Sequence, residues 1–101
     1  MLQDKVAVIS GSAVGIGRGL AVGLARAGAH IVGLDIDITN NAETAALVRG
    51  VGRECMDLHC DIGDAASVAR AIGAAATRFG RIDVLVNNAA LWLDCSLTSG
   101  T

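Results

Sequence analysis

The sequence contains no tyrosine and no proline, and aromatic residues make up only 2% of its 101 residues. It also lacks a run of basic residues, and its 8 basic and 10 acidic side chains give a net charge of −2. We therefore expect no nucleic-acid partner, because such surfaces combine clustered basic residues with aromatic ones. The apolar runs are too short to span a membrane, so we expect no membrane partner. The N-terminal MLQDK lacks the pattern of a signal peptide, which predicts a cytoplasmic protein.

Hydrophobic residues make up 52% of the chain, enough for a packed core in one small domain. The three cysteines, Cys55, Cys60 and Cys95, are odd in number and have neither zinc-site nor C-x-x-C spacing. We expect them to be small buried residues. His30 and His59 have no neighbouring ligand pattern, so the sequence predicts no metal site.

Short apolar runs alternate along the chain with segments of helical periodicity. The apolar runs predict strands at 5–10, 29–35, 54–60 and 82–86. The periodic segments predict helices at 15–27, 40–49 and 65–79, and residues 91–101 show no clear pattern. Strands separated by helices imply parallel pairing and an α/β fold with right-handed crossovers.

The same patterns predict which helix faces are buried and where the helices end. The first helix should bury one apolar face, formed by Ile16, Leu20, Leu24 and Ala27. The third helix should bury another, formed by Val68, Ile72, Ala75 and Phe79. The spacing of Asn40 and Glu43 predicts a capping box for the second helix, and Asp64 is the expected N-cap of the third. The expected helix-ending glycines are Gly28, Gly50 and Gly80.

Three glycines, Gly11, Gly15 and Gly17, lie between the first predicted strand and the first predicted helix. In an open parallel sheet a phosphate binds there, at the carboxyl end of the strand and the N-terminus of the helix. Gly11 permits a sharp turn, Gly15 leaves backbone N–H groups accessible, and Gly17 lets the helix approach the sheet. The pattern alone is weak in a chain with 13 glycines, but the strand before it and the helix after it strengthen the prediction.

An acidic residue, Asp35, ends the next predicted strand, 18 residues after Gly17. A carboxylate there can accept hydrogen bonds from both hydroxyl groups of an adenosine ribose and repels a 2′-phosphate, which favours NAD over NADP. The alternative is a solvated acid at a strand end. Asp37 is expected to be solvated, and Arg18 to be exposed rather than to clamp a phosphate.

Three segments together resemble the short-chain dehydrogenase/reductase family. Residues 10–17, SGSAVGIG, look like its T-G-x-x-x-G-I-G turn, with Ser10 in the threonine position. Asp61 and Ile62 are similar to the D-V pair that contacts adenine in the family, and residues 87–90, NNAA, look like N-N-A-G. The resemblance covers nearly the whole chain. It implies a Rossmann-like, doubly wound parallel sheet, truncated after about the fourth strand in the order βαβαβαβ.

The resemblance also implies what each part of the chain does. Residues 1–101 would be the N-terminal part of a single NAD(P)-binding Rossmann domain whose catalytic half is absent. Its cofactor-binding residues would be Gly11, Ser12, Gly15, Ile16, Gly17, Asp35, Asp61, Ile62 and Asn88. The full-length form would transfer a hydride between the nicotinamide cofactor and an alcohol or carbonyl substrate, and would be a homo-oligomer. Ala90 stands where the family has glycine, and we expect its methyl group to be tolerated.

No catalytic residue can be carried over from the family. Its members use a tyrosine and a lysine in Y-x-x-x-K together with a serine, but this sequence has no tyrosine and its only lysine is Lys5. Ser96 and Ser99 therefore have no tyrosine to act with. The chain should be inactive alone, so the sequence leaves open whether it is an enzyme. Two alternatives remain: a non-catalytic NAD-binding or regulatory module that completes its sheet with another subunit, and a remnant that neither folds nor binds.

Overall fold

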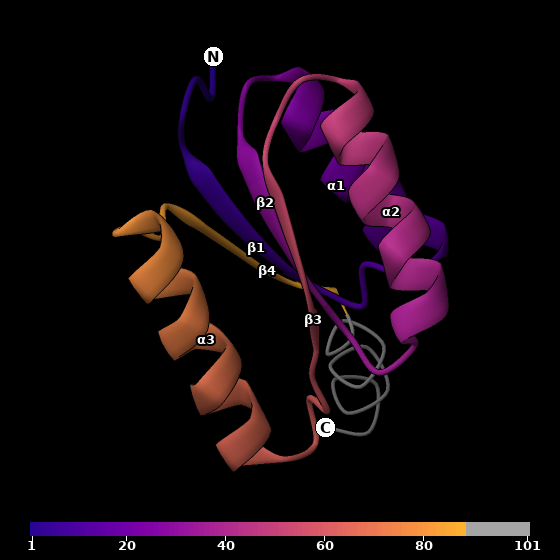
Figure 1. Ribbon diagram of the computed structural model, residues 1–101, viewed down its shortest axis with the longest axis vertical. Helices are drawn as coiled ribbons and strands as arrows, with labels where there is room; N and C mark the ends of the chain where they lie inside the picture. The colour runs from indigo at the N-terminus through magenta and orange to yellow at the C-terminus, as the bar shows by residue number, and fades with distance from the viewer. Residues whose placement is uncertain (89–101) are drawn as a thin grey trace, which may run out of the picture.

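The computed structural model describes residues 1–88 as one parallel sheet with helices on both faces (Figure 1). The elements in chain order are β1 (Val6–Ser10), α1 (Gly15–Arg26), β2 (His30–Asp35), α2 (Ile38–Gly50), β3 (Cys55–His59), α3 (Ala65–Phe79) and β4 (Val84–Asn87). The spatial order of the strands is β3-β2-β1-β4. This arrangement confirms the predicted Rossmann-like α/β fold.

Strand β1 is one of the two inner strands of the sheet and pairs with β2 on one side and β4 on the other. Val8 is the register partner of Val32 in β2 and of Leu85 in β4, both in parallel. The chain thus moves outward from β1 to β3 and then crosses back to the other side of β1. Such a reversal of strand order opens a crevice at the carboxyl ends of the strands, where doubly wound folds bind ligands.

The two faces of the sheet are covered by different helices: α1 and α2 lie on one face and α3 on the other (Figure 1). The core on the α1–α2 face contains Ala7, Ile9, Ala21, Ala25, Ala29, Ile31, Ala45, Val48 and Cys55. The core on the α3 face contains Val6, Val8, Val32, Leu34, Cys60, Ala71 and Ala75. Because β1 and most of β2 are covered on both faces, their sequences are nearly continuous apolar runs rather than alternating ones.

The predicted apolar face of α1 is partly wrong. Ile16 was expected to be buried but is 72% exposed, and the buried residues of α1 are Gly17, Ala21 and Ala25. These small side chains let α1 lie close to the sheet, with Leu20 and Leu24 packed at its margins. The predicted face of α3 is confirmed, since all four residues expected on it belong to the core or pack against it.

The start of α2 also differs from the prediction. The helix begins at Ile38, and its N-cap is Asp37, whose carboxylate accepts a hydrogen bond from the Asn40 backbone N–H at 3.0 Å. The predicted capping box of Asn40 and Glu43 is therefore wrong, because both residues lie inside the helix. Asp37 also accepts from the Asn40 side-chain amide at 2.7 Å, and these two bonds lower the pKa of its carboxyl group. Asp64 caps α3 as predicted, accepting from the Ala66 N–H at 3.0 Å.

The predicted ends of α1 and α3 and the burial of two cysteines are confirmed, but Gly50 does not end α2 as predicted. It lies inside that helix, whose C-cap is Val51, and the glycine with a positive φ after it is Gly52, at 87°. Gly80, in the left-handed conformation with φ of 73°, ends α3, and Gly28, with φ of 112°, follows α1. Cys55 and Cys60 are buried free thiols, and burial raises the pKa of Cys55 to about 11. Cys95 lies outside the described residues. None of the helices within residues 1–88 is long and apolar enough to cross a membrane.

Candidate functional site

The turn that joins β1 to α1 depends on its three predicted glycines. Gly11 has φ of 69° and Gly15 has φ of 59°, in the left-handed region that residues with a side chain rarely adopt. Gly17 is buried, and a Cβ atom there would lie only 1.8 Å from the Gly11 carbonyl oxygen. The turn can therefore close against the first turn of α1 only with glycine at position 17.

The N-terminus of α1 has no side-chain cap. Val14 at the N-cap position makes no capping hydrogen bond, and no acidic residue lies in the first turn. The first helical hydrogen bond runs from the Arg18 N–H to the Val14 carbonyl oxygen, at 3.4 Å. The backbone N–H groups before Arg18 therefore keep the partial positive charge of a helix N-terminus, and Ile16 is 72% exposed there. An anionic group has both access to this turn and donors to bind.

The Asp35 carboxylate lies at the end of β2 and joins the turn to the β2–α2 loop. Its Oδ2 accepts a hydrogen bond from the Ala13 N–H at 2.9 Å, and its Oδ1 accepts one from the Asp37 N–H at 2.9 Å. Each carboxylate oxygen has a second lone pair, so further donors can still bind. The residue is half-buried and held in place at the edge of the sheet where β1 and β2 end.

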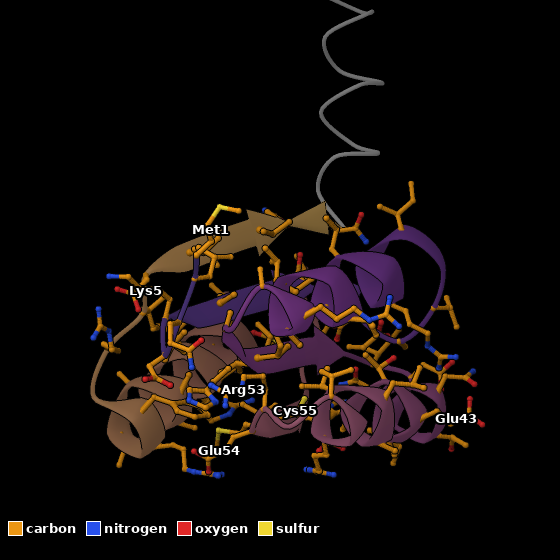
Figure 2. All side chains as sticks on the ribbon, turned by 90° about the horizontal axis from the view of Figure 1, so that it is seen from above. Met1, Lys5, Glu43, Arg53, Glu54 and Cys55 are labelled. Carbon is orange, nitrogen blue, oxygen red and sulfur yellow. The ribbon has the colours of Figure 1, made fainter. Side chains whose placement is uncertain are left out.

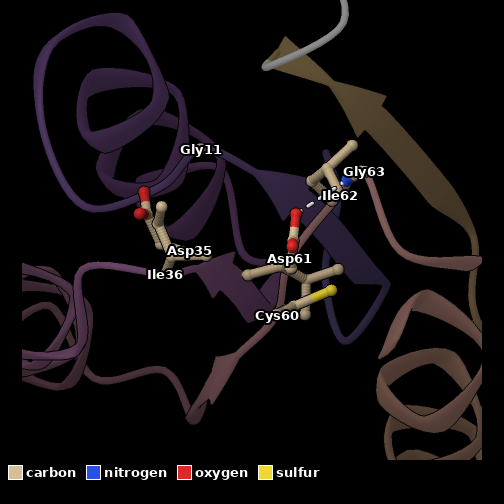
Figure 3. A pocket seen from close by; sticks show the side chains of 8 residues that line it. Gly11, Asp35, Ile36, Cys60, Asp61, Ile62 and Gly63 are labelled. Atoms are coloured by element: carbon tan, nitrogen blue, oxygen red, sulfur yellow. Dashed lines mark hydrogen bonds between the residues drawn. The ribbon is translucent and has the colours of Figure 1, made fainter. Parts of the chain in front are cut away.

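A hollow of about 190 Å³ lies beside Asp35 at the ends of β2 and β3 (Figure 3). It is lined by Gly11, Leu34, Asp35, Ile36, Cys60, Asp61, Ile62 and Gly63. Figure 3 shows the Asp35 and Asp61 side chains on different strand ends around it. The Asp61 Oδ1 accepts from the Gly63 N–H at 2.9 Å, which fixes its carboxylate at the rim. Apolar walls with a carboxylate at the rim suit a flat ring that carries an amino group.

The Ser12 side chain points away from the open side of the turn. It is fully buried, and its Oγ donates a hydrogen bond to the Asn41 Oδ1 of α2 at 2.7 Å. The Thr44 Oγ1 donates to the Ser12 carbonyl oxygen at 2.8 Å. The sequence analysis did not identify Asn41 or Thr44. The available signal was the spacing of a buried helix face, which the buried residues of α2 share: Asn41, Thr44, Ala45 and Val48.

The prediction that Arg18 is exposed is wrong, because only 27% of its side-chain surface is accessible. Its Nε donates to the Thr44 Oγ1 at 2.9 Å, and a terminal nitrogen donates to the Asn40 carbonyl oxygen at 2.7 Å. The same nitrogen forms an ion pair with Glu43 at 3.3 Å. The guanidinium thus uses the donors on Nε and one terminal nitrogen to join α1 to α2.

Two asparagines at the end of β4 join that strand to the turn. The Asn88 Nδ2 donates to the Gly11 carbonyl oxygen at 3.2 Å, and the Ser10 Oγ donates to the Asn87 Oδ1 at 2.9 Å. Asn88 thus lies against the turn, as its predicted role requires, while contact with a cofactor stays a prediction. Ala89 and Ala90 lie outside the described residues.

The only lysine lies far from this site. Figure 2 shows Lys5 near one end of the molecule and Glu43, which pairs with Arg18 beside the turn, at the other. Lys5 precedes β1, whereas the site is formed where β1 ends. Ser96 and Ser99 lie outside the described residues. Within residues 1–88, no three side chains of metal-binding type gather into a site.

Comparison with known proteins identifies the family. The family model described as short chain dehydrogenase matches residues 5–99. The 2-dehydro-3-deoxy-D-gluconate 5-dehydrogenase of Dickeya dadantii is 44% identical over 90 residues, which cover 89% of this chain and 35% of that protein. The D-threitol dehydrogenase of Mycolicibacterium smegmatis is 42% identical, over 87% of this chain and 34% of that protein. The chain thus spans about a third of the length of these curated relatives.

Solved structures agree with this match. The carveol dehydrogenase of Mycobacterium avium, solved in complex with NAD, superposes with a TM-score of 0.82 at 34% identity. That superposition covers 86% of this chain and 36% of the other. A short-chain dehydrogenase/reductase structure from Burkholderia xenovorans superposes with a TM-score of 0.80 at 40% identity, over 85% of this chain and 35% of the other. The glycine turn, the carboxylate that ends β2 and the strand order β3-β2-β1-β4 all fit this result, and the chain belongs to the short-chain dehydrogenase family.

Proposed function

We propose that this chain binds the adenosine diphosphate half of NAD. We further propose that the whole protein transfers a hydride between NAD and an alcohol or carbonyl substrate. The observation that supports this most directly is the Asp35 carboxylate, which is hydrogen-bonded to the Ala13 N–H of the turn and also lines the neighbouring hollow. A ribose, a diphosphate and an adenine ring need these three environments side by side.

The residues around the turn fit a diphosphate. The first turn of α1 carries no acidic residue and no capping side chain, so its N–H groups can donate to phosphate oxygens. A Cβ on Gly15 would meet no atom within 4 Å, so the space beside its backbone is open. Gly11, Gly15, Ile16 and Gly17 would provide these contacts mainly through the backbone. The Ser12 hydroxyl is engaged with Asn41, so we assign Ser12 to the support of the turn.

The charges near Asp35 favour NAD over NADP. Asp37 is two residues away, and hydrogen bonds from Asn40 lower the pKa of its carboxyl group, so a second carboxylate adds its negative charge beside Asp35. Two unit charges about 4 Å apart interact with roughly 1 kcal/mol in water and about 4 kcal/mol near a protein surface. Repulsion of a 2′-phosphate should therefore weaken NADP binding at least about fivefold relative to NAD.

The hollow beside Asp35 would hold the adenine ring. Leu34, Ile36 and Ile62 supply apolar walls, and the Asp61 carboxylate at the rim can accept from the adenine amino group. Bound NAD would supply the hydride acceptor, while the residues of this chain would bind and orient it. Cytoplasmic location and assembly into a homo-oligomer stay predictions. The relatives named for a gluconate derivative and for D-threitol suggest a small hydroxylated substrate.

Calorimetric titration of the chain with NAD and with NADP at one ionic strength tests the proposal. We expect saturable binding of NAD, with NADP at least about fivefold weaker. Asp35→Asn should weaken NAD binding and reduce the ratio of the NAD affinity to the NADP affinity, because the amide removes the negative charge. Asp57→Asn is the matched control, since Asp57 is an exposed β3 carboxylate that does not line the hollow. An Asp35→Asn variant with an unchanged ratio of affinities would contradict the assignment, and NADP binding tighter than NAD would contradict the choice of cofactor.

A further inference from the structure

We propose that Thr44 is a positioning residue that holds the phosphate-binding turn through its hydroxyl group. The proposal rests on the proposed function, because it concerns how the turn presents its N–H groups to a diphosphate. Thr44 lies on α2, 1% exposed, and makes no contact with the open side of the turn. Its effect on binding would act entirely through the backbone of Ser12 and Ala13.

The Thr44 hydroxyl contacts both carbonyl groups at the centre of the turn. Its Oγ1 lies 2.8 Å from the Ser12 carbonyl oxygen and 3.2 Å from that of Ala13. On the other side of the same residue, the Ala13 N–H donates to the Asp35 carboxylate at 2.9 Å. The N–H and C=O groups of Ala13 are thus held by two different elements, β2 and α2. The segment that follows, 14–16, is exposed, and the Val14 side chain makes no capping hydrogen bond.

The hydrogen-bond directions at Thr44 follow from the donors available. The Arg18 Nε–H can only donate, and it lies 2.9 Å from the Thr44 Oγ1. The threonine hydroxyl has one proton, so it accepts from Arg18 and donates chiefly to the nearest carbonyl oxygen, that of Ser12 at 2.8 Å. The carbonyl oxygens of Ala13, at 3.2 Å, and of Asn40, at 3.5 Å, share this proton more weakly. Arg18 thereby fixes the orientation of the hydroxyl and connects α1, α2 and the turn in one network.

The Asn41 side chain of α2 connects the turn to β2. The Asn41 side chain accepts from the Ser12 Oγ at 2.7 Å and donates to the Gly33 carbonyl oxygen at 3.0 Å. Gly33 lies in β2, and a Cβ atom there would come 2.6 Å from the Ser12 Oγ. No buried side-chain nitrogen or oxygen within residues 1–88 lacks a hydrogen-bond partner. A fully satisfied buried network of this kind fixes a single geometry, which is what a rigid anion-binding turn needs.

Removing the hydroxyl should therefore affect one part of the ligand. In Thr44→Val, the turn carbonyls lose their donor and the Arg18 Nε–H loses its acceptor, while the size of the side chain is kept. The turn can then relax, and its N–H groups no longer point to one place. The hollow that would hold adenine is lined by other residues and keeps its walls. The diphosphate should lose affinity, and adenosine should not.

The test compares adenosine with ADP as calorimetric ligands for the whole chain. In the parent chain we expect ADP to bind more tightly than adenosine. In Thr44→Val we expect ADP binding to weaken about tenfold, the size associated with one well-made hydrogen-bonding group, and adenosine binding to change less than about twofold. Thr44→Ser keeps the hydroxyl and should restore ADP binding to within about twofold. Thr77→Val, on the exposed surface of α3, is the matched control and should leave both affinities unchanged.

Several results would overturn the proposal. Equal losses for adenosine and ADP in Thr44→Val would mean that Thr44 only supports the fold, and an unchanged ADP affinity would mean that the turn does not depend on it. If Thr44→Val does not fold, Ser12→Ala decides, because it removes the other side-chain bond between turn and α2 and should also weaken ADP alone. Failure of the parent chain to bind ADP at all would instead refute the proposed function, and with it this inference.

Discussion

Replacing Gly17 with alanine should strongly destabilise the fold. The added Cβ would lie 1.8 Å from the Gly11 carbonyl oxygen, 2.6 Å from its carbonyl carbon and 2.9 Å from the Asn88 Nδ2. Two of these atoms belong to the backbone and cannot rotate away, so α1 or the turn must move. Overpacking in a rigid interior typically costs 1–3 kcal/mol, and we expect about 3 kcal/mol or more here.

The matched control is Gly19→Ala, two residues further along the same helix. A Cβ on Gly19 would meet no atom within 4 Å, and the position is exposed. Alanine is a better helix former than glycine, so Gly19→Ala should stabilise the fold by about 0.5–1 kcal/mol. The same chemical change should therefore have opposite signs at the two positions, separated by about 4 kcal/mol.

Urea unfolding followed by circular dichroism measures this difference. With a slope of roughly 2 kcal/mol per molar urea, the two midpoints should differ by about 2 M. The slopes themselves should agree, which would show that the comparison concerns the stability of one folded state. Equal midpoints, or a Gly17→Ala variant as stable as the parent, would refute the close approach of turn and helix on which the site is built.

Two further predictions concern ionisable groups away from the turn. Hydrogen bonds from the Arg81 guanidinium, and then from a backbone N–H, lower the pKa of Asp83 to about 2, so its contribution to stability is present above about pH 4 and is lost as the pH falls toward 2. Asp83→Asn should lower the urea midpoint at pH 6. The difference in midpoint between this variant and the parent should shrink as the pH falls from 4 to 2, and a difference that stays constant would contradict the ion pair. Burial raises the pKa of Cys55 to about 11, so in a chain with Cys60 and Cys95 replaced by serine its thiol should react slowly with a disulfide reagent at pH 8 and rapidly in urea. Rapid reaction without urea would show that the thiol is accessible.

The parts of the site formed by neighbouring residues could be predicted from the sequence. A glycine-rich turn between an apolar strand and a helix has few alternative structures, and Gly11 and Gly15 have the positive φ values that such a turn requires. Asp35 could be placed because a strand that follows a helix must return to the same sheet edge. Its hydrogen bond to the Ala13 N–H joins two segments that are 22 residues apart, and the βαβ order alone brings them together.

The choice between two possible N-cap side chains, and the contacts between helices, could not be predicted in the same way. Asp37 and Asn40 are both good N-caps, and the sequence pattern selected Asn40 because Glu43 follows at the right spacing. The structure uses Asp37, whose charged carboxylate accepts from both the backbone and the side chain of Asn40. The position of Arg18 was missed for a related reason. Its acceptors on α2 become neighbours only once the two helices are packed, and helix periodicity does not show which helices those are.

The caps of the three described helices explain why only one of them is suited to bind an anion. Asp64 closes the N-terminus of α3 and Asp37 that of α2, so each of these helix ends already has a negative charge and a hydrogen-bond acceptor. The residue in the same position before α1 is Val14, whose side chain has no hydrogen-bond acceptor. An uncapped helix N-terminus costs roughly 1 kcal/mol of stability, and that cost is recovered when a ligand supplies the missing acceptor. A Val14→Asp substitution would supply it from the chain itself, and would therefore stabilise the helix while competing with the diphosphate.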